Sequence, residues 1–177
     1  RVFQTGSMQR SWDRFRQGVN LIRNGYIGEI KEVKVAIGAP YKACDLPSQP
    51  IPETIDWNAW IGPAPYRGYH FDLACPIEDK RWGMWRDYTP FGGGMITDWG
   101  AHMFDIVQWA LDMDDTGPLH FTPPGGVAVE GLTYTYANGI TVTHTKWGRG
   151  NNEIQFIGTE GRLEISRGYL KTFPNTD

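Results

Sequence analysis

Asp98, His102 and Asp105 are the residues whose types and spacing could carry chemistry. Residues at positions i, i+4 and i+7 of a helix lie along one side of it, and a helix is expected from Met95 to Asp112. A carboxylate in the first turn is favoured by the helix dipole. A carboxylate one turn before a histidine can orient its ring and support its protonated form. The spacing therefore predicts an acid–base pair of Asp98 and His102.

The same stripe allows other interpretations. Asp98 could be only a helix-start carboxylate, His102 a core histidine, and Asp105 a carboxylate that binds a neighbouring loop. A second hypothesis is a metal-assisted sugar hydrolase or lyase with all three residues as ligands, although catalytic metal sites usually have more varied donors. A third hypothesis is a non-catalytic module for sugar binding or oligomerisation.

Aromatic and basic residues near this helix are candidates for ligand binding. Trp82, Trp85 and Arg86 precede the helix by a short stretch, and Arg10 lies in a polar cluster, Gln9 to Ser11, close to the start of the chain. Indole rings stack on the C–H faces of sugars, and guanidinium groups pair with hydroxyl or phosphate oxygens. We expect Trp82 and Arg86 to bind substrate.

The surrounding pattern predicts an α+β fold, in which helices cover one face of a large open, mainly antiparallel β-sheet. Residues 38–90 lack regular periodicity and form a long aromatic loop, with one helical turn at residues 56–60. Asn138-Gly139 is a strong hairpin signal. The predicted elements are strands at 1–6, 30–37, 119–122, 132–136, 140–144, 153–157 and 162–165, and helices at 8–26 and 95–112.

Composition excludes several classes of function. The 177 residues carry a net charge of −3 with scattered basic residues, so no nucleic-acid partner is expected. No apolar run approaches the roughly 18 residues that cross a bilayer, so we expect no membrane partner. Two cysteines are too few for a disulfide framework or a thiolate zinc site. No glycine-rich nucleotide motif occurs, so any nucleotide must be held mostly by residues outside this sequence.

The segment from Gly92 to Asp105 resembles a motif of the glucose–fructose oxidoreductase/inositol dehydrogenase (Gfo/Idh/MocA) family, G-G-G-x-x-x-D-x-G-x-H-x-x-D. Other stretches resemble the family in the same order along the chain. They are Gln4–Gly6, Gln9–Ser11, Arg23–Ile30, Asp56–Trp57, Trp60–Pro65, Trp85–Arg86 and Gly158–Gly161.

The resemblance implies a two-domain enzyme with an N-terminal Rossmann domain that holds NAD or NADP. Residues 1–177 resemble the second, substrate-binding and catalytic domain, which often provides the oligomer contact through its sheet. The family's catalytic lysine lies in a Glu-Lys-Pro motif that this sequence lacks, and relatives continue past its last residues. We therefore expect a segment truncated at both ends and inactive by itself.

The activity implied is alcohol–ketone interconversion on a sugar or polyol. Asp98 and His102 match the acidic and proton-transfer positions of the family, and Trp85 and Arg86 match a pair near the cofactor. Arg10 matches a position in the pocket wall. The sequence leaves open the particular sugar, the choice between NAD and NADP, the number of subunits and the localisation, for which cytoplasm is the default and an exported form the alternative.

Overall fold

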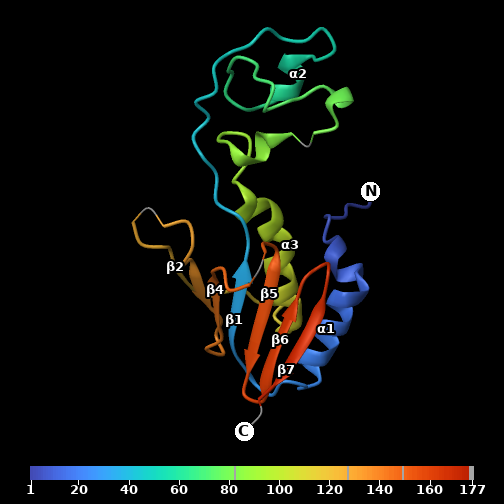
Figure 1. Cartoon of the computed structure of the whole chain (residues 1–177), viewed down its shortest axis with the longest axis vertical. Helices are drawn as coiled ribbons and strands as arrows, with labels where there is room; N and C mark the ends of the chain where they lie inside the picture. The colour runs from blue at the N-terminus through green and yellow to red at the C-terminus, as the bar shows by residue number, and fades with distance from the viewer. Residues whose placement is uncertain (82, 127, 149, 176–177) are drawn as a thin grey trace. The chain divides into compact units, whose positions relative to one another are not determined.

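The computed structural model describes residues 1–81, 83–126, 128–148 and 150–175 (Figure 1). The chain divides into two compact units, and each is considered by itself. Arg1–Gly38 and Trp99–Asp177 form the first, here called the sheet unit, and Ala39–Asp98 form the second, the aromatic unit. Helix α3 (Met95–Ala110) begins in the aromatic unit and continues in the sheet unit.

The sheet unit contains one seven-stranded sheet, in the order β2-β3-β4-β1-β5-β6-β7. Within the described residues, β1 and β4 form a parallel pair, and the other neighbouring strands are antiparallel. The predicted large open, mainly antiparallel sheet is therefore confirmed. The strands are β1 (Ile30–Ala36), β2 (His120–Thr122), β3 (Thr133–Thr135), β4 (Thr141–His144), β5 (Glu153–Gly158), β6 (Gly161–Ile165) and β7 (Leu170–Pro174).

Alternation along the strands separates an apolar face of this sheet from a polar one. Val33 pairs with Phe156, which pairs with Leu163, and all three side chains are fully buried. The next row, Lys34, Gln155 and Glu164, points to the opposite face because successive side chains of a strand alternate.

Helix α1 (Asp13–Arg23) covers the apolar face and follows a 3-10 turn, η1 (Met8–Ser11). Figure 1 shows α1 along β6 and β7. A Cβ atom on Gly18 of this helix would lie 2.6 Å from the Cδ1 atom of Ile165, so glycine permits the close approach. The helix is shorter than the predicted range of residues 8–26, and Met8 and Tyr26 at the two ends of that range are exposed.

Two expectations at the edges of this unit were wrong. Residues 1–6 form no strand, and Val2 and Phe3 are exposed, because this segment pairs with no strand of the described sheet. The last strand, β7, was missed because Leu170–Pro174 has only a weak apolar alternation. The predicted hairpin is confirmed, since Tyr134 pairs with Val142 and Gly139 adopts a φ of 84° in the turn.

The aromatic unit has a core of its own, although its sequence lacks periodicity. Its buried residues are Trp57, Ile61, Tyr69, Leu73, Ala74 and Tyr88. Its helical elements are α2 (Trp57–Ile61), η2 (Ile77–Asp79) and η3 (Met84–Asp87). Helix α2 confirms the predicted turn, because Asp56 accepts a hydrogen bond from the amide of Ala59 at 3.0 Å and caps the helix. Ring packing, rather than regular secondary structure, holds this segment together.

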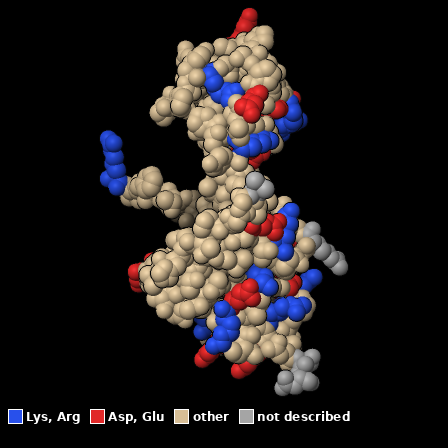
Figure 2. All heavy atoms as spheres, turned by 90° about the vertical axis from the view of Figure 1, so that its left-hand side faces the viewer, with Lys and Arg blue, Asp and Glu red and all other residues tan. Residues whose placement is uncertain are grey.

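Among the described residues, no helix is long and apolar enough to span a membrane. On the face drawn in Figure 2, Lys and Arg side chains alternate with Asp and Glu side chains instead of forming one basic patch.

Candidate functional site

A glycine turn positions the start of α3. Gly94 adopts a φ of 77°, and a Cβ atom there would lie 2.2 Å from the carbonyl carbon of Pro40. The amide of Asp98 donates to the carbonyl of Gly94 at 3.1 Å, which places Asp98 in the first helical turn. A side chain at position 94 would clash with backbone, so the turn that presents Asp98 depends on glycine.

Asp98 is held by Arg86 within the aromatic unit. Nε of Arg86 lies 2.9 Å from Oδ2 of Asp98. Nη1 of Arg86 donates to the carbonyl of Gly83 at 2.6 Å, and the guanidinium carbon lies 4.9 Å from the ring centre of Trp85. Three of the predicted site residues, Trp85, Arg86 and Asp98, are therefore brought together.

His102 lies four positions further along α3, in the sheet unit. The ring centres of His102 and Trp99 are 6.0 Å apart with their planes at 72°, an edge-to-face arrangement. The guanidinium carbon of Arg167 lies 4.2 Å from the ring centre of Trp99 and 5.2 Å from that of Trp12. Arg167 also donates to the side chain of Gln9, which is fully buried.

Neither Arg167 nor Trp99 was predicted from the sequence to lie beside His102. Arg167 is remote from Trp99 in sequence, and no local pattern links them. Asp98 contacts Arg86 and His102 contacts Trp99, and the acid–base partnership of Asp98 with His102 stays a prediction.

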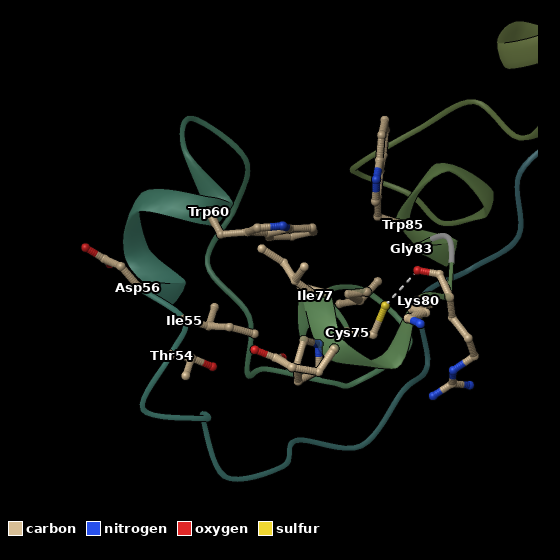
Figure 3. Close-up of a pocket in the computed structure, with 14 residues that line it drawn as sticks. Thr54, Ile55, Asp56, Trp60, Cys75, Ile77, Lys80, Gly83 and Trp85 are labelled. Atoms are coloured by element: carbon tan, nitrogen blue, oxygen red, sulfur yellow. Dashed lines mark hydrogen bonds between the residues drawn. The ribbon is translucent and has the colours of Figure 1, made fainter.

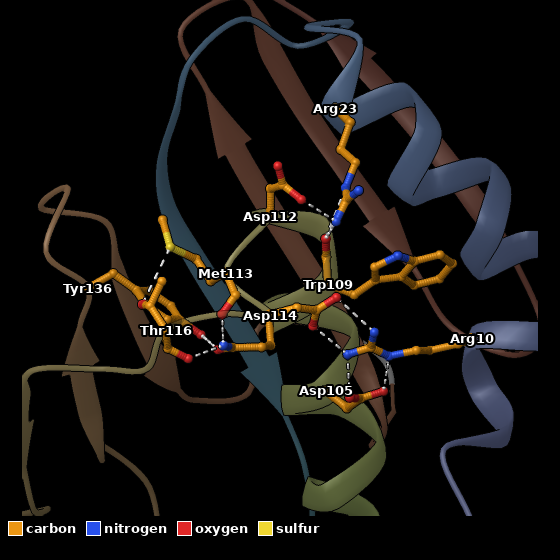
Figure 4. A network of polar contacts seen from close by, with 10 residues as sticks. Arg10, Arg23, Asp105, Trp109, Asp112, Met113, Asp114, Thr116 and Tyr136 are labelled. Carbon is orange, nitrogen blue, oxygen red and sulfur yellow. Dashed lines mark hydrogen bonds and ion pairs between the residues drawn. The ribbon is translucent and has the colours of Figure 1, made fainter.

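Arg10 lies in a network with two carboxylates (Figure 4). Its Nε and Nη2 donate to the two oxygens of Asp105 at 2.9 and 2.7 Å, and its Nη1 and Nη2 donate to the two oxygens of Asp114 at 2.9 and 2.7 Å. These hydrogen bonds raise the pKa of Arg10 and lower the pKa of Asp114. Trp109 supports the guanidinium group with its ring centre 5.6 Å away. The arrangement indicates a structural role, and the predicted place of Arg10 in a substrate pocket stays a prediction.

The network also bears on the metal hypothesis. Both carboxylate oxygens of Asp105 accept hydrogen bonds from Arg10. Within the described part of the chain, no group of three or more His, Cys, Asp or Glu residues is arranged to hold a metal ion. The stripe of Asp98, His102 and Asp105 is therefore not a preformed metal site.

Two large cavities lie among the described residues of the aromatic unit. One has a volume of about 600 Å³ and is lined by Trp60, Cys75, Ile77 and Trp85, among others (Figure 3). The other, of about 730 Å³, also includes Trp60 and Trp85. Neither of these cavities is lined by Asp98. The predicted substrate residue Trp82 lies outside the described residues.

A family model described as "Oxidoreductase family, C-terminal alpha/beta domain" matches residues 40–177. The chain therefore belongs to the Gfo/Idh/MocA oxidoreductase family and corresponds to its C-terminal domain, as the sequence motifs predicted. A comparison with curated protein sequences gave no match.

Several solved structures are similar to this chain at low sequence identity. A super-repressor mutant of Gal80p from Saccharomyces cerevisiae is 14% identical, with a TM-score of 0.50 over 96% of this chain and 47% of that one. An oxidoreductase domain protein from Kribbella flavida is 18% identical, with a TM-score of 0.49 over 97% and 44%. The WlbA dehydrogenase from Bordetella pertussis, solved with NADH and UDP-GlcNAcA, is 13% identical, with a TM-score of 0.47 over 97% and 46%. The chain thus spans less than half the length of these proteins.

Proposed function

We propose that this chain is the substrate-binding and catalytic domain of an NAD(P)-dependent oxidoreductase that acts on a hydroxyl group of a sugar or polyol. Membership of the oxidoreductase family supports the reaction class. The observation that carries the assignment of the site is the ion pair of Arg86 with Asp98 at 2.9 Å, next to Trp85 and at the start of the helix that bears His102.

Of the two residues that match the family's cofactor positions, Trp85 is better placed than Arg86 to contact a bound dinucleotide. Trp85 is 38% exposed, so part of its indole surface is accessible for stacking on a nicotinamide ring. The side chain of Arg86 is 11% exposed and paired with Asp98. We therefore assign Trp85 as the cofactor contact, with Arg86 holding Trp85 and Asp98 in place. The bound cofactor supplies the hydride acceptor at the nicotinamide.

His102 takes the proton of the substrate hydroxyl as the alcohol is oxidised, and returns it in the reverse direction. This role requires an imidazole nitrogen within about 3 Å of the reacting oxygen. The edge contact with Trp99 restricts the rotation of the ring, and Arg167 in turn holds Trp99. Asp98 orients the imidazole and balances the charge it acquires.

The proposal includes two partners beside the substrate. An N-terminal Rossmann domain of the same protein would bind most of the cofactor and supply the family's lysine. A second copy would pack on the polar face of the sheet, where the side-chain amide of Gln155 donates to Glu164 at 2.8 Å and Lys34 lies beside Glu32. A face with alternating charges can complement itself across a twofold axis.

Kinetics of the full-length protein test the proposed roles. We expect His102→Ala and Asp98→Asn to lower kcat by about 10²–10⁴-fold while the Kd of NAD(P) changes little, because a positioned acid–base group contributes about that much. His120→Ala is a matched control, since His120 is exposed on β2. Equal losses in kcat and cofactor binding would contradict the assigned roles. Sugar binding without turnover in the wild-type protein would instead support a non-catalytic module.

A further inference from the structure

The cavity of the aromatic unit that includes Ile77 is built around aromatic and aliphatic side chains. Ile55, Trp60, Leu73, Ile77 and Trp85 contribute to its lining, and its volume is about 600 Å³. Binding sites for small organic molecules typically have volumes of roughly 300–1,000 Å³ and apolar walls. The size and the lining therefore fit one small organic ligand.

Trp60 provides a rigid platform in this cavity. One face of its ring stacks on Trp57, with ring centres 4.7 Å apart and planes at 14°. Trp57 is only 2% exposed, and its indole nitrogen donates to the carbonyl of Arg67 at 2.8 Å. Figure 3 shows the Trp60 ring lying across the cavity above Ile77. Because Trp57 covers the back of Trp60, the platform exists before any ligand binds.

Trp85 forms a second wall of the cavity, and a residue of the candidate functional site contacts the Trp85 ring. Figure 3 shows its ring standing at the far side of the cavity from Asp56, with Trp60 between them. The guanidinium carbon of Arg86 lies 4.9 Å from the Trp85 ring centre, and Arg86 pairs with Asp98. The wall of the cavity is thereby linked through Arg86 to the predicted catalytic carboxylate.

Several polar groups of the lining already have partners within the unit. Asp56 caps α2. The thiol of Cys75 donates to the carbonyl of Arg81 at 3.2 Å. The guanidinium group of Arg81 pairs with Asp79 and stacks on the ring of Phe71. Ile77, in contrast, is 93% exposed on the cavity wall. A planar apolar ring would cover Ile77 and stack on Trp60, and it would need no hydrogen bond from the three groups that are already paired.

We propose that this cavity binds an aromatic ring, and that the ring is the aglycone of an aryl glycoside. The identification of the ligand as an aryl glycoside rests on the proposed function, because the sugar part of the ligand comes from that proposal. The binding of an aromatic ring in this cavity does not depend on the proposed function. Trp85 is shared between this cavity and the proposed cofactor contact, so the experiment has to separate the two ligands.

Binding to this chain without cofactor tests the proposal independently of turnover. Phenyl β-D-glucopyranoside and methyl β-D-glucopyranoside are titrated with tryptophan fluorescence and ligand-observed NMR as readouts. We expect the phenyl glycoside to bind at least about tenfold more tightly, because a single well-packed ring contact is worth about that factor. Ile77→Glu should abolish this preference. Ile51→Glu, which changes another exposed isoleucine of the same unit outside the cavity, should preserve it.

Three results would overturn the inference. They are equal affinity for the two glycosides, an unchanged preference in Ile77→Glu, and displacement of the phenyl glycoside by NADH, which would make the cavity part of the cofactor site. Trp60→Ala provides a second variant, and circular dichroism shows whether each variant is folded. A protein that binds the phenyl glycoside but oxidises no sugar would refute the proposed function alone.

Discussion

Replacing Arg10 with alanine separates a structural role for this residue from a substrate-binding one. The side chain is 31% exposed and makes two ion pairs, with Asp105 and Asp114, each with two hydrogen bonds. Partly exposed ion pairs contribute about 0.2–1 kcal/mol each, and bidentate geometry favours the upper end of this range. Arg10→Ala should therefore lower the free energy of unfolding by about 1–2 kcal/mol.

Urea denaturation at several pH values measures this effect. The Arg10 guanidinium lowers the pKa of Asp114 in the folded protein. A carboxylate whose pKa is lowered on folding contributes stability above its unfolded pKa of about 3.9, and this stability is lost as the pH falls through the folded value. The difference between wild type and Arg10→Ala should thus be full near pH 7 and shrink below about pH 4.

Arg10→Lys is the matched control, since it keeps one positive charge but loses the bidentate hydrogen bonds. It should recover only part of the lost stability. If Arg10→Ala denatured at the wild-type urea concentration while the KM for the sugar rose, the structural interpretation would be refuted and the predicted pocket role supported.

Further predictions concern the turn before α3 and the residue that holds Asp98. Gly94→Ala should destabilise the aromatic unit by about 2 kcal/mol or more, measured by thermal denaturation, because its φ is 77° and the new Cβ would clash with Pro40. Arg86→Ala in the full-length protein should lower kcat, since Asp98 loses its partner and Trp85 loses its support, whereas Arg86→Lys should retain part of the activity in steady-state assays.

At Gly94 both backbone strain and a steric clash are expected to lower stability, and Gly62→Ala separates these two causes. Gly62 lies in the same unit with a φ of 57°, but a Cβ atom there would have no neighbour within 4 Å. The loss of stability in Gly62→Ala therefore measures backbone strain alone. Equal losses of stability in Gly62→Ala and Gly94→Ala would contradict the predicted clash. For Arg86, a variant with normal kcat but poor sugar binding would show that it contacts substrate directly.

Much of the fold follows from patterns that neighbouring residues create. The alternation of Val33, Lys34 and Val35 predicts a strand with one buried face, and Asn138-Gly139 predicts the turn of the hairpin. The helical turn predicted at residues 56–60 is present, and Asp56 caps it. Local backbone preferences and the period of the side chains are sufficient for such features because they depend on residues close together in the chain.

Other features depend on contacts between residues that are far apart in sequence. Arg10 and Asp105 are 95 positions apart, and nothing local indicates that they pair. The aromatic segment has no period, so its core around Trp57 and Tyr69 could not be read from the sequence. The residue types at Asp98 and His102 indicated possible acid–base chemistry, but their immediate contacts with Arg86 and Trp99 arise only when the folded chain brings these side chains together. Side-chain pairing and ring packing are set by three-dimensional proximity, which a linear pattern does not encode.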